Sequence, residues 1–444
     1  MAKYKAYPEY KTISNSWLDS IPKGWELLPL KYLCTSFVKD GPHETPVFLE
    51  EGVPFLSVDG IQNNKLVFDG CRYISPSDHY RFSQKCKPVK GDVLLGKAAS
   101  IGKVALVDTS IEFNVWSPLA VITPIRSCLS KFIYYSFQTT MLQAQCEVYS
   151  NSNTQKNLGM NTIDNLDFAM PSDKEASTIS NFLDHETAKI DNLIEKQQKL
   201  IELLKEKRQA VISAVVSIRN NEGKTKLKNL VSIQTGYPFS SAKFKLSPDN
   251  NIPLLRGVNV GVDNIKWDDV VYWDVSALDN LNEYLLVADD IVFGMDRPWI
   301  SSGARVSEIK EQDLPCLLLQ RVARIRSNIN SYQPFIKLCL SSNEFREYAE
   351  IDLTGVSVPH ISPEQISNFY VRDIPFDDQV VLTKKVLKQI EKIQITQEMV
   401  EQTIRILQER RTALISAAVT GKIDVRDWVA PDTQESEEPQ EVSA

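Results

Sequence analysis

Two stretches of the chain have apolar residues at alternating spacings of four and three positions, which is typical of helices packed along one seam. In the first stretch the seam residues are Ile190, Ile194, Ile201, Leu204, Val211 and Val215. In the second stretch they are Ile393, Val400, Ile404, Leu407, Leu414 and Ala418. The pattern predicts helices within 181–220 and 381–428, each about 33 residues long, or about 50 Å at 1.5 Å per residue.

The two helical stretches also match one another without gaps. KEKRQAVISAVVS (205–217) aligns with QERRTALISAAVT (408–420), and seven of the thirteen positions are identical. Polar residues that break the seams can fix the register and orientation of paired helices. These residues are Gln197, Arg208, Gln397 and Arg411. A single helix of this kind could be a dimerising arm, whereas two matching helices in one chain are expected to pack together as an antiparallel coiled coil.

A segment with strand and turn signals precedes each helix, over 22–180 and 225–380. Short β-branched runs are bounded there by Gly, Pro and Asp. Similar short strings recur in the same order in both segments. For example, GDVLLG (91–96) parallels DDIVFG (289–294). The predicted fold class is therefore α+β, with two tandem β-rich domains separated by a long antiparallel two-helix coiled coil in an internal pseudo-twofold repeat. Residues 1–21 are an N-terminal extension.

The charge distribution changes what the chain can bind. The formal net charge of −7 has the wrong sign for a nucleic-acid binder. From Asp424 onward, however, the chain has seven acidic residues against the single cation Arg426, so the remainder is close to neutral. The acidic tail, 429–444, has a composition that predicts disorder. Binding to nucleic acid would need locally clustered cations, or a partner, to hold the phosphates.

Cysteine usage and hydropathy bear on location. The seven cysteines form no CxxC pair, and the spacing of Cys71, His79 and Cys86 fits no zinc pattern, so no metal site is expected. The chain has no run of about 18 apolar residues that would predict a transmembrane helix. The opening MAKYKAYPEYKTISNSW lacks the apolar core of a secretory signal. We therefore expect a cytoplasmic protein with unpaired thiols.

Signatures of catalysis are missing from the sequence. There is no GxxxxGK[ST] loop for ATP and no GxSxG elbow. The string DRPW (296–299) has Arg297 where an adenine-methyltransferase motif would need a proline. These absences favour a binding protein over an enzyme. A stand-alone modification or restriction enzyme, and a coiled-coil scaffold that binds only proteins, remain the alternatives.

The order of the landmarks resembles that of the specificity subunits of type I restriction–modification systems, over roughly 20–428. The strings that carry the resemblance are IPKGWELLPL (21–30), QTGYPFSSAKF (234–244), PLLRGVNV (253–260), VPHIS (358–362) and VTGKIDVRDW (419–428). Two features depart from the family pattern. The chain has MPSDKEAS (170–177) and IPFDDQVV (374–381) where a Pro-Pro-Leu-x-x-Gln run is common, and GKAASIG (96–102) where an Arg-Gly pair is common.

The resemblance implies a specific division of labour. Each β-rich domain would be a target-recognition domain that reads one half of a bipartite, asymmetric site in double-stranded DNA. The helical pair would set the unread spacer and dock two methyltransferase subunits, to which restriction and translocase subunits add. Those partners would use S-adenosylmethionine, ATP and Mg²⁺ for DNA methylation and phage defence. This chain would be a non-catalytic subunit with no cofactor of its own.

Candidate DNA contacts are cations, amides and hydroxyls in glycine-rich or polar turns, because such groups read base edges and hold phosphates. In the first domain they are Lys97, Ser100, Lys103, Asn151, Ser152, Asn153 and Gln155. In the second domain they are Tyr237, Ser240, Ser241, Lys243, Arg256, Asn259, Arg297 and Arg305. For each residue the alternative is a solvated loop position or an internal hydrogen bond. Arg321, Arg324 and Arg326 could form a structural ion-pair ladder as readily as contact phosphates.

Overall fold

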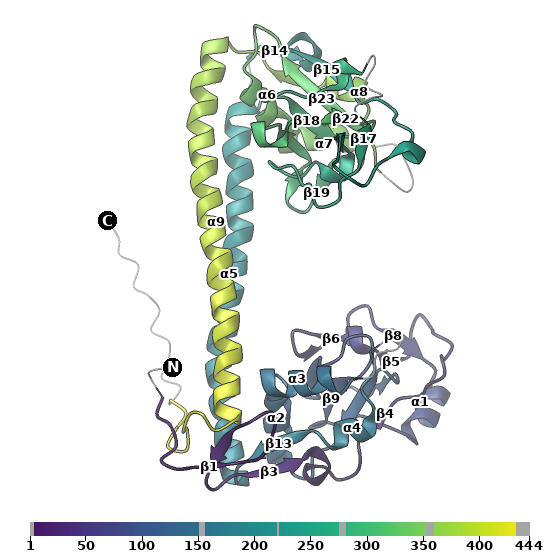
Figure 1. Ribbon diagram of the computed structural model, residues 1–444, viewed down its shortest axis with the longest axis vertical. Coiled ribbons are helices and arrows are strands. Elements are labelled where there is room, and N and C mark those ends of the chain that lie inside the picture. Colours follow the sequence, from purple (N-terminus) through teal and green to yellow (C-terminus); the bar gives the residue numbers. More distant parts are fainter. Residues whose placement is uncertain (1–3, 151–155, 220–221, 275–280, 352–358, 432–444) are drawn as a thin grey trace. The chain divides into compact units, whose positions relative to one another are not determined.

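The structure, a computed structural model, describes residues 4–150, 156–219, 222–274, 281–351 and 359–431 (Figure 1). The chain divides into two compact units. Unit 1 comprises Met1–Lys196 and Thr403–Ala444, and unit 2 comprises Gln197–Gln402. Each unit therefore combines one mixed α/β domain with a segment of each of two long helices. Candidate residues Asn151, Ser152, Asn153 and Gln155 and most of the acidic tail lie outside the described residues.

The two long helices are α5 (Asp173–Val216) and α9 (Phe376–Val419). Helix α5 starts at Asp173 rather than at 181, because its first turns bury Ala176 and Ile179 in the core of unit 1 instead of in the helical seam. Helix α9 ends at Val419 rather than at 428. Its last turn closes with the Lys422 amide bonded to the Ala417 carbonyl at 2.8 Å and with Gly421 at a φ of 72°, a left-handed conformation that favours glycine.

Segments of α5 and α9 lie side by side within each unit. In unit 1, Arg411 of α9 donates to Asp191 of α5, with Nε and Oδ1 2.8 Å apart. In unit 2, residues 202–213 of α5 and residues 393–401 of α9 line the same hollow. All twelve predicted seam residues are buried or partly buried.

The domain of unit 1 is built from short strands and helices. Its four-stranded sheet has the order β10-β9-β12-β4: Val104–Leu106, Val93–Gly96, Leu119–Ile122 and Lys39–Asp40. A three-stranded sheet has the order β11-β5-β8: Asn114–Val115, Val53–Leu56 and Arg72–Ile74. The strand pairs are β13 (Asp167–Met170) with β3 (Glu26–Pro29), β1 (Tyr10–Thr12) with β2 (Ser20–Pro22), and β6 (Ile61–Gln62) with β7 (Lys65–Leu66). The shorter helices are α1 (Pro76–Ser83), α2 (Ser127–Ser136), α3 (Thr140–Val148) and α4 (Met160–Asp164).

The domain of unit 2 has sheets of the same strand order. Its four-stranded sheet runs β21-β18-β23-β15: Val306–Glu308, Ile291–Gly294, Val322–Ser327 and Val231–Thr235. Its three-stranded sheet runs β22-β16-β17: Leu317–Leu318, Asn251–Leu255 and Tyr272–Asp274. The strand pairs are β14 (Lys224–Lys226) with β24 (Tyr370–Arg372), and β19 (Trp299–Ile300) with β20 (Gly303–Ala304). The shorter helices are α6 (Gln333–Leu340), α7 (Asn343–Ile351) and α8 (Pro363–Asn368), together with the 3-10 turns η4 (Ser241–Lys243) and η5 (Gly257–Asn259).

The central strands β9 and β18 are buried on both faces. In β9, Val93 and Leu95 pack into one core and Leu94 into another. In β18, Ile291 and Phe293 likewise face one core and Val292 faces a second. Because alternate residues of a strand point to opposite faces, each strand is fixed from both sides. The loop that follows each strand is therefore held on a rigid support.

None of the helices in the described residues has both the length and the apolar character that crossing a membrane requires.

Candidate nucleic-acid interface

The loop after each central strand is held by the same three kinds of backbone bond. In unit 2, the Gly294 amide donates to the Arg305 carbonyl at 2.9 Å. The Met295 amide donates to the Arg321 carbonyl at 3.0 Å, and the Ile361 amide to the Met295 carbonyl at 3.0 Å. We call the place where these three segments meet the platform of unit 2.

Unit 1 builds the same backbone platform. The Gly96 amide donates to the Lys103 carbonyl at 2.7 Å, and the Lys97 amide to the Pro118 carbonyl at 2.9 Å. The third bond runs from the Leu158 amide to the Lys97 carbonyl at 2.7 Å. The two platforms therefore place corresponding residues at corresponding points of each domain.

The platform of unit 2 displays polar and charged side chains. Arg297 is exposed and has a φ of 45°, and Arg321 has a φ of 72° with its side chain 57% exposed. His360 Nδ1 lies 2.7 Å from Asp296 Oδ1, and Arg321 Nη1 lies 3.7 Å from the same oxygen. A non-glycine residue with positive φ is uncommon and is often found at functional loops. Two exposed cations on such backbone are suited to contact phosphates or guanine edges.

The platform of unit 1 displays different side chains on the same backbone. An isolated β-bridge joins Ala98 to Asn157, as one joins Asp296 to His360 in unit 2. Ala99 has a φ of 63° and is exposed. Of the candidates nearby, Lys103 is exposed and Ser100 is partly exposed. The backbone is common to both units, whereas the chemistry on it differs.

A second exposed group lies beside the platform of unit 2. Tyr237, Ser240, Ser241 and Lys243 are all exposed, the last three at turn η4. The Gln320 amide, next to Arg321 in the chain, donates to the Tyr237 carbonyl at 3.0 Å. This group therefore adds two serine hydroxyls, a lysine cation and a tyrosine ring close to the platform.

Four of the candidate DNA contacts are engaged inside their own domains instead. Lys97 is only 7% exposed, and its Nζ lies 3.3 Å from Oδ2 of the buried Asp40. Arg305 donates from Nε to the Val260 carbonyl at 3.0 Å and from Nη1 to the Asp296 carbonyl at 2.8 Å. Burial lowers the pKa of Arg305. Both cations are held in place by these partners inside their own domains.

Arg256 and Asn259 are likewise structural. Asn259 is 1% exposed, and its Nδ2 donates to the carbonyls of Lys266 and Asp269 at 2.8 and 2.9 Å. Arg256 donates from Nη2 to the Asp269 carbonyl at 2.7 Å, and its amide donates to Asn259 Oδ1 at 3.0 Å. Together they close turn η5, so both side chains have a structural role within their own domain.

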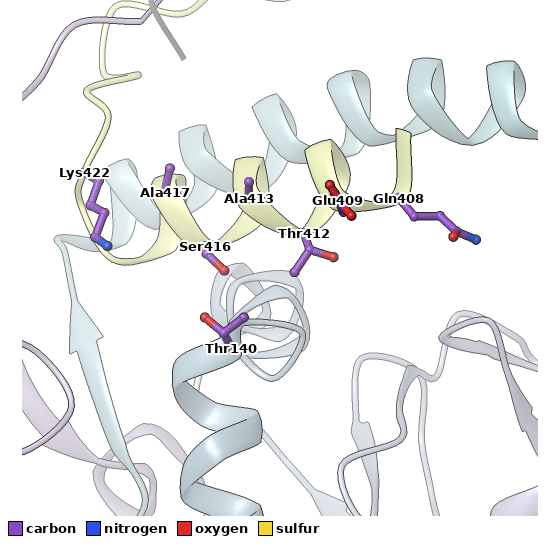
Figure 2. A pocket seen from close by; sticks show the side chains of 8 residues that line it. All are labelled: Thr140, Gln408, Glu409, Thr412, Ala413, Ser416, Ala417 and Lys422. Carbon is purple, nitrogen blue, oxygen red and sulfur yellow. The ribbon is translucent and has the colours of Figure 1, made fainter. Parts of the chain in front are cut away.

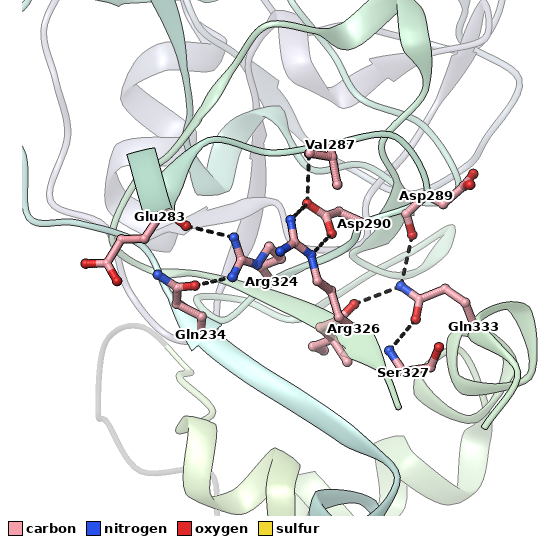
Figure 3. Close-up of polar contacts among 10 residues, drawn as sticks. Gln234, Glu283, Val287, Asp289, Asp290, Arg324, Arg326, Ser327 and Gln333 are labelled. Carbon is pink, nitrogen blue, oxygen red and sulfur yellow. Dashed lines mark hydrogen bonds and ion pairs between the residues drawn. The ribbon is translucent and has the colours of Figure 1, made fainter. Parts of the chain in front are cut away.

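The three neighbouring arginines divide into two roles (Figure 3). Arg326 of β23 forms a two-pronged ion pair with Asp290, whose side chain is 1% exposed, and the Nη2–Oδ2 distance is 2.8 Å. This hydrogen bond raises the pKa of Arg326. Arg324 donates to the Glu283 carbonyl at 2.8 Å and to the Gln234 side chain. These two are structural, whereas Arg321 precedes the strand and belongs to the platform.

The platform also contains residues that sequence reasoning missed. Asp296 and His360 were not among the candidates, although both fall inside strings that were noted for other reasons. His360 and Arg321 are 39 positions apart in the chain, so no local pattern joins them. The strings DRPW (296–299) and VPHIS (358–362), which contain Asp296 and His360, carried the signal in the sequence.

A hollow of about 520 Å³ lies on unit 1, along the last turns of α9 (Figure 2). Small and polar residues of α9 line it, together with Thr140 at the start of α3; they are Gln408, Glu409, Thr412, Ala413, Ser416 and Ala417, with Lys422 beyond the helix end. A larger hollow of about 930 Å³ in unit 2 includes the matching α5 residues Glu206, Gln209, Ala210 and Ser213, with Asn343 at the start of α7. Each unit therefore offers a groove over the same stretch of the repeated helix.

Comparison with known proteins shows which proteins this chain is similar to. Residues 22–204 match the family described as type I restriction modification DNA specificity domain. The chain is 32% identical over 155 residues to the EcoAI specificity subunit of Escherichia coli, covering 35% of this chain and 26% of that subunit. It is 28% identical over 204 residues to the MjaVIII specificity subunit of Methanocaldococcus jannaschii, covering 46% of each. The chain thus spans less than half the length of these relatives.

A solved structure shows the same fold over most of the chain. It comes from work on complex assembly and conformational transition of the type I R-M system, and it has a TM-score of 0.69 and 13% sequence identity. The likeness covers 91% of this chain and 99% of that chain. At 13% identity, this likeness is evidence for the fold alone. The resemblance to type I specificity subunits, first drawn from the sequence, is confirmed by the family match and by the related subunits.

Proposed function

We propose that this chain is the sequence-reading subunit for a bipartite, asymmetric DNA target. The chain is related to type I specificity subunits, and its residues 22–204 match their DNA specificity domain. The domain of each unit acts as a target-recognition domain and reads one half of the target. The chain itself is non-catalytic. The chemistry belongs to partner subunits.

One observation carries this proposal, namely that the two platforms share their backbone bonds but differ in their side chains. Unit 2 displays Arg297, Arg321 and His360, while unit 1 displays Ala99 and Asn157. Base edges in the major groove are distinguished by the donors and acceptors set against them. A duplicated scaffold with different side chains is suited to reading two different half-sites, which supports an asymmetric target.

The matching helices support a role in assembly. The grooves on α9 and on α5 are lined by corresponding residues, such as Glu409 and Glu206, and Ser416 and Ser213. Two equivalent surfaces favour two copies of one partner. We assign them to two methyltransferase subunits, which supply S-adenosylmethionine chemistry. Restriction and translocase subunits, which use ATP and Mg²⁺, join through that complex, and the antiparallel pairing of α5 and α9 sets the unread spacer.

Methylome sequencing tests the proposal. The full chain is expressed with its methyltransferase partner, and the DNA is compared with DNA from cells that express the partner alone. We expect a new N6-methyladenine motif in two parts with a fixed gap. If the complex forms with a competent methyltransferase and no motif appears, the chain does not specify sequence, and a protein-only scaffold becomes the better account. Methylation by the chain alone would identify it as an enzyme.

A further inference from the structure

Arg208 of α5 and Arg411 of α9 occupy matching positions in the repeated helix. The sequence places both in the seam, where a polar residue is expected to fix helix register. In the structure each side chain is only 18% exposed. Each also reaches the globular domain of its own unit.

In unit 2, Arg208 is held by a turn of the recognition domain. Its Nη2 donates to Asp263 Oδ2, and Lys337 Nζ lies 3.0 Å from the other carboxylate oxygen. Asp263 has a φ of 58°, and its amide donates to the Val306 carbonyl at 3.0 Å. Burial alone would raise the pKa of Asp263, but Lys337 and Arg208 together hold it below its ordinary value. The carboxylate is thus held by Arg208 from the helix and by Lys337 from the domain.

This turn connects directly to the platform of unit 2. A bridge between Val260 and Ile265 closes the turn on either side of Asp263. Arg305 then donates to the Val260 carbonyl at 3.0 Å and to the Asp296 carbonyl at 2.8 Å. A continuous series of polar contacts therefore runs from the helix, through the turn, to the residue that pairs with His360.

In unit 1, Arg411 makes the corresponding connection through an amide. Its Nη1 donates to Gln138 Oε1 at 2.9 Å, and the same oxygen accepts from Asn64 Nδ2 at 3.1 Å. Asn64 lies in the turn between β6 and β7 with a φ of 60°. Arg411 Nε also donates to Asp191 of α5 at 2.8 Å. Arg208 thus contacts the turn of its domain directly, and Arg411 is linked to the equivalent turn through Gln138.

We propose that Arg208 and Arg411 are positioning residues that fix the angle at which each recognition domain leaves its helix, and thereby the spacer length that the complex accepts. This inference rests on the proposed function. Hydrogen bonds to charged groups are the strong ones, and a planar guanidinium loses little freedom when it is held at two points. An apolar seam residue could pack the helices but could not hold a polar turn.

A distance measurement on the full chain tests the anchoring without DNA. Spin labels are placed within unit 2 at Lys207 and at Ile329, which is 92% exposed, after the partly exposed Cys71 and Cys128 are changed to serine. We expect one narrow distance distribution for the parent chain. Arg208→Gln is expected to broaden or shift it. An unchanged distribution in a folded Arg208→Gln variant would overturn the proposal.

Two further variants separate positioning from folding. Asp263→Asn removes the charge, and asparagine tolerates the left-handed backbone of the turn, so the domain should fold. Its effect is expected to match that of Arg208→Gln and not to add to it, as for two partners in one contact. The matched control is Lys205→Gln, which removes a cation that pairs with Glu202 of the same helix at 3.0 Å. It should leave the distance distribution unchanged.

A second arm measures spacer choice in the assembled methyltransferase complex. Binding is compared on duplexes with the native spacer and with spacers one base pair longer or shorter. We expect Arg208→Gln and Arg411→Gln each to reduce the ratio of affinities for the native and the altered spacers roughly tenfold, which is the scale of one charged hydrogen bond. A uniform loss on all spacers would overturn the spacer role. If the parent complex prefers no bipartite target, the proposed function fails, while the distance measurement still decides whether the arginine fixes the domain.

Discussion

Replacing Arg326 by methionine is expected to destabilise unit 2 rather than to weaken DNA binding directly. The change removes the guanidinium that pairs with Asp290, whose side chain is 1% exposed (Figure 3). A buried carboxylate that loses its partner remains desolvated and uncompensated. Because Asp290 lies immediately before β18, the destabilisation should fall on the sheet that supports the platform.

The expected magnitude follows from what remains around Asp290. Removing one partner of a buried ion pair costs about 3–5 kcal/mol. Here the Arg326 side chain is 37% exposed, and Asp290 keeps the amide of Val287 at 2.9 Å. We therefore expect Arg326→Met to lower the free energy of unfolding of unit 2 by about 2–3 kcal/mol. Arg324→Met is the matched control on the same strand. It removes bonds to a carbonyl and an amide and leaves no buried charge, so it should cost about 1 kcal/mol.

Hydrogen exchange followed by mass spectrometry resolves this effect within the full chain. In Arg326→Met, the amides of β18 and β23 should exchange roughly 30- to 140-fold faster than in the parent if they open with their unit. Adding Asp290→Asn should restore much of the protection, because both charges are then gone. Unchanged protection together with weaker DNA binding would refute the reasoning and make Arg326 a phosphate contact.

Three further substitutions test a buried amide, an exposed cation of the platform and a buried carboxylate. Asn259→Ala should destabilise unit 2 by about 1–3 kcal/mol, measured by hydrogen exchange at turn η5, because two buried carbonyls lose their donor. Arg321→Gln should leave stability unchanged, weaken binding to the second half-site by roughly tenfold, and reduce the salt dependence of binding by about one ion. Burial raises the pKa of Asp92 in the folded chain. The protonated carboxyl therefore stabilises the fold at pH values below the pKa that Asp92 has in the unfolded chain. This stabilisation is lost as the pH rises through the raised pKa of the folded chain. Asp92→Asn should abolish that pH dependence of the melting temperature.

The sequence was sufficient to predict the two long helices, because the four-three spacing of residues such as Ile190 and Ile393 is a local signal. The helix boundaries were less accessible. Ala176 and Ile179 continue α5 toward its N-terminus but pack into the core of unit 1, so they lie off the seam spacing on which the prediction relied. When a helix buries one face along part of its length and another face along the rest, a single periodicity in the sequence does not predict where the helix begins.

The candidate site was only partly predictable, because the same residue types serve structure and recognition. Lys97 and Arg305 flank glycines in exposed-looking loops, yet Lys97 pairs with the buried Asp40 and Arg305 holds two carbonyls. Those partners come from other segments of the chain and have no local signature. Arg297 was selected by the same criterion and is exposed at the platform. The tertiary fold determines which cations pair with groups inside the domain and which remain exposed.

The division of reading between the two units is the central claim, and a domain exchange tests it most directly. Residues 22–180 are replaced by the corresponding domain of another specificity subunit, and the hybrid is expressed with the methyltransferase partner for methylome sequencing. The account predicts a bipartite motif in which one half changes and the other half is retained. A motif that changes in both halves, or in neither, would contradict the claim that each unit reads its own half-site.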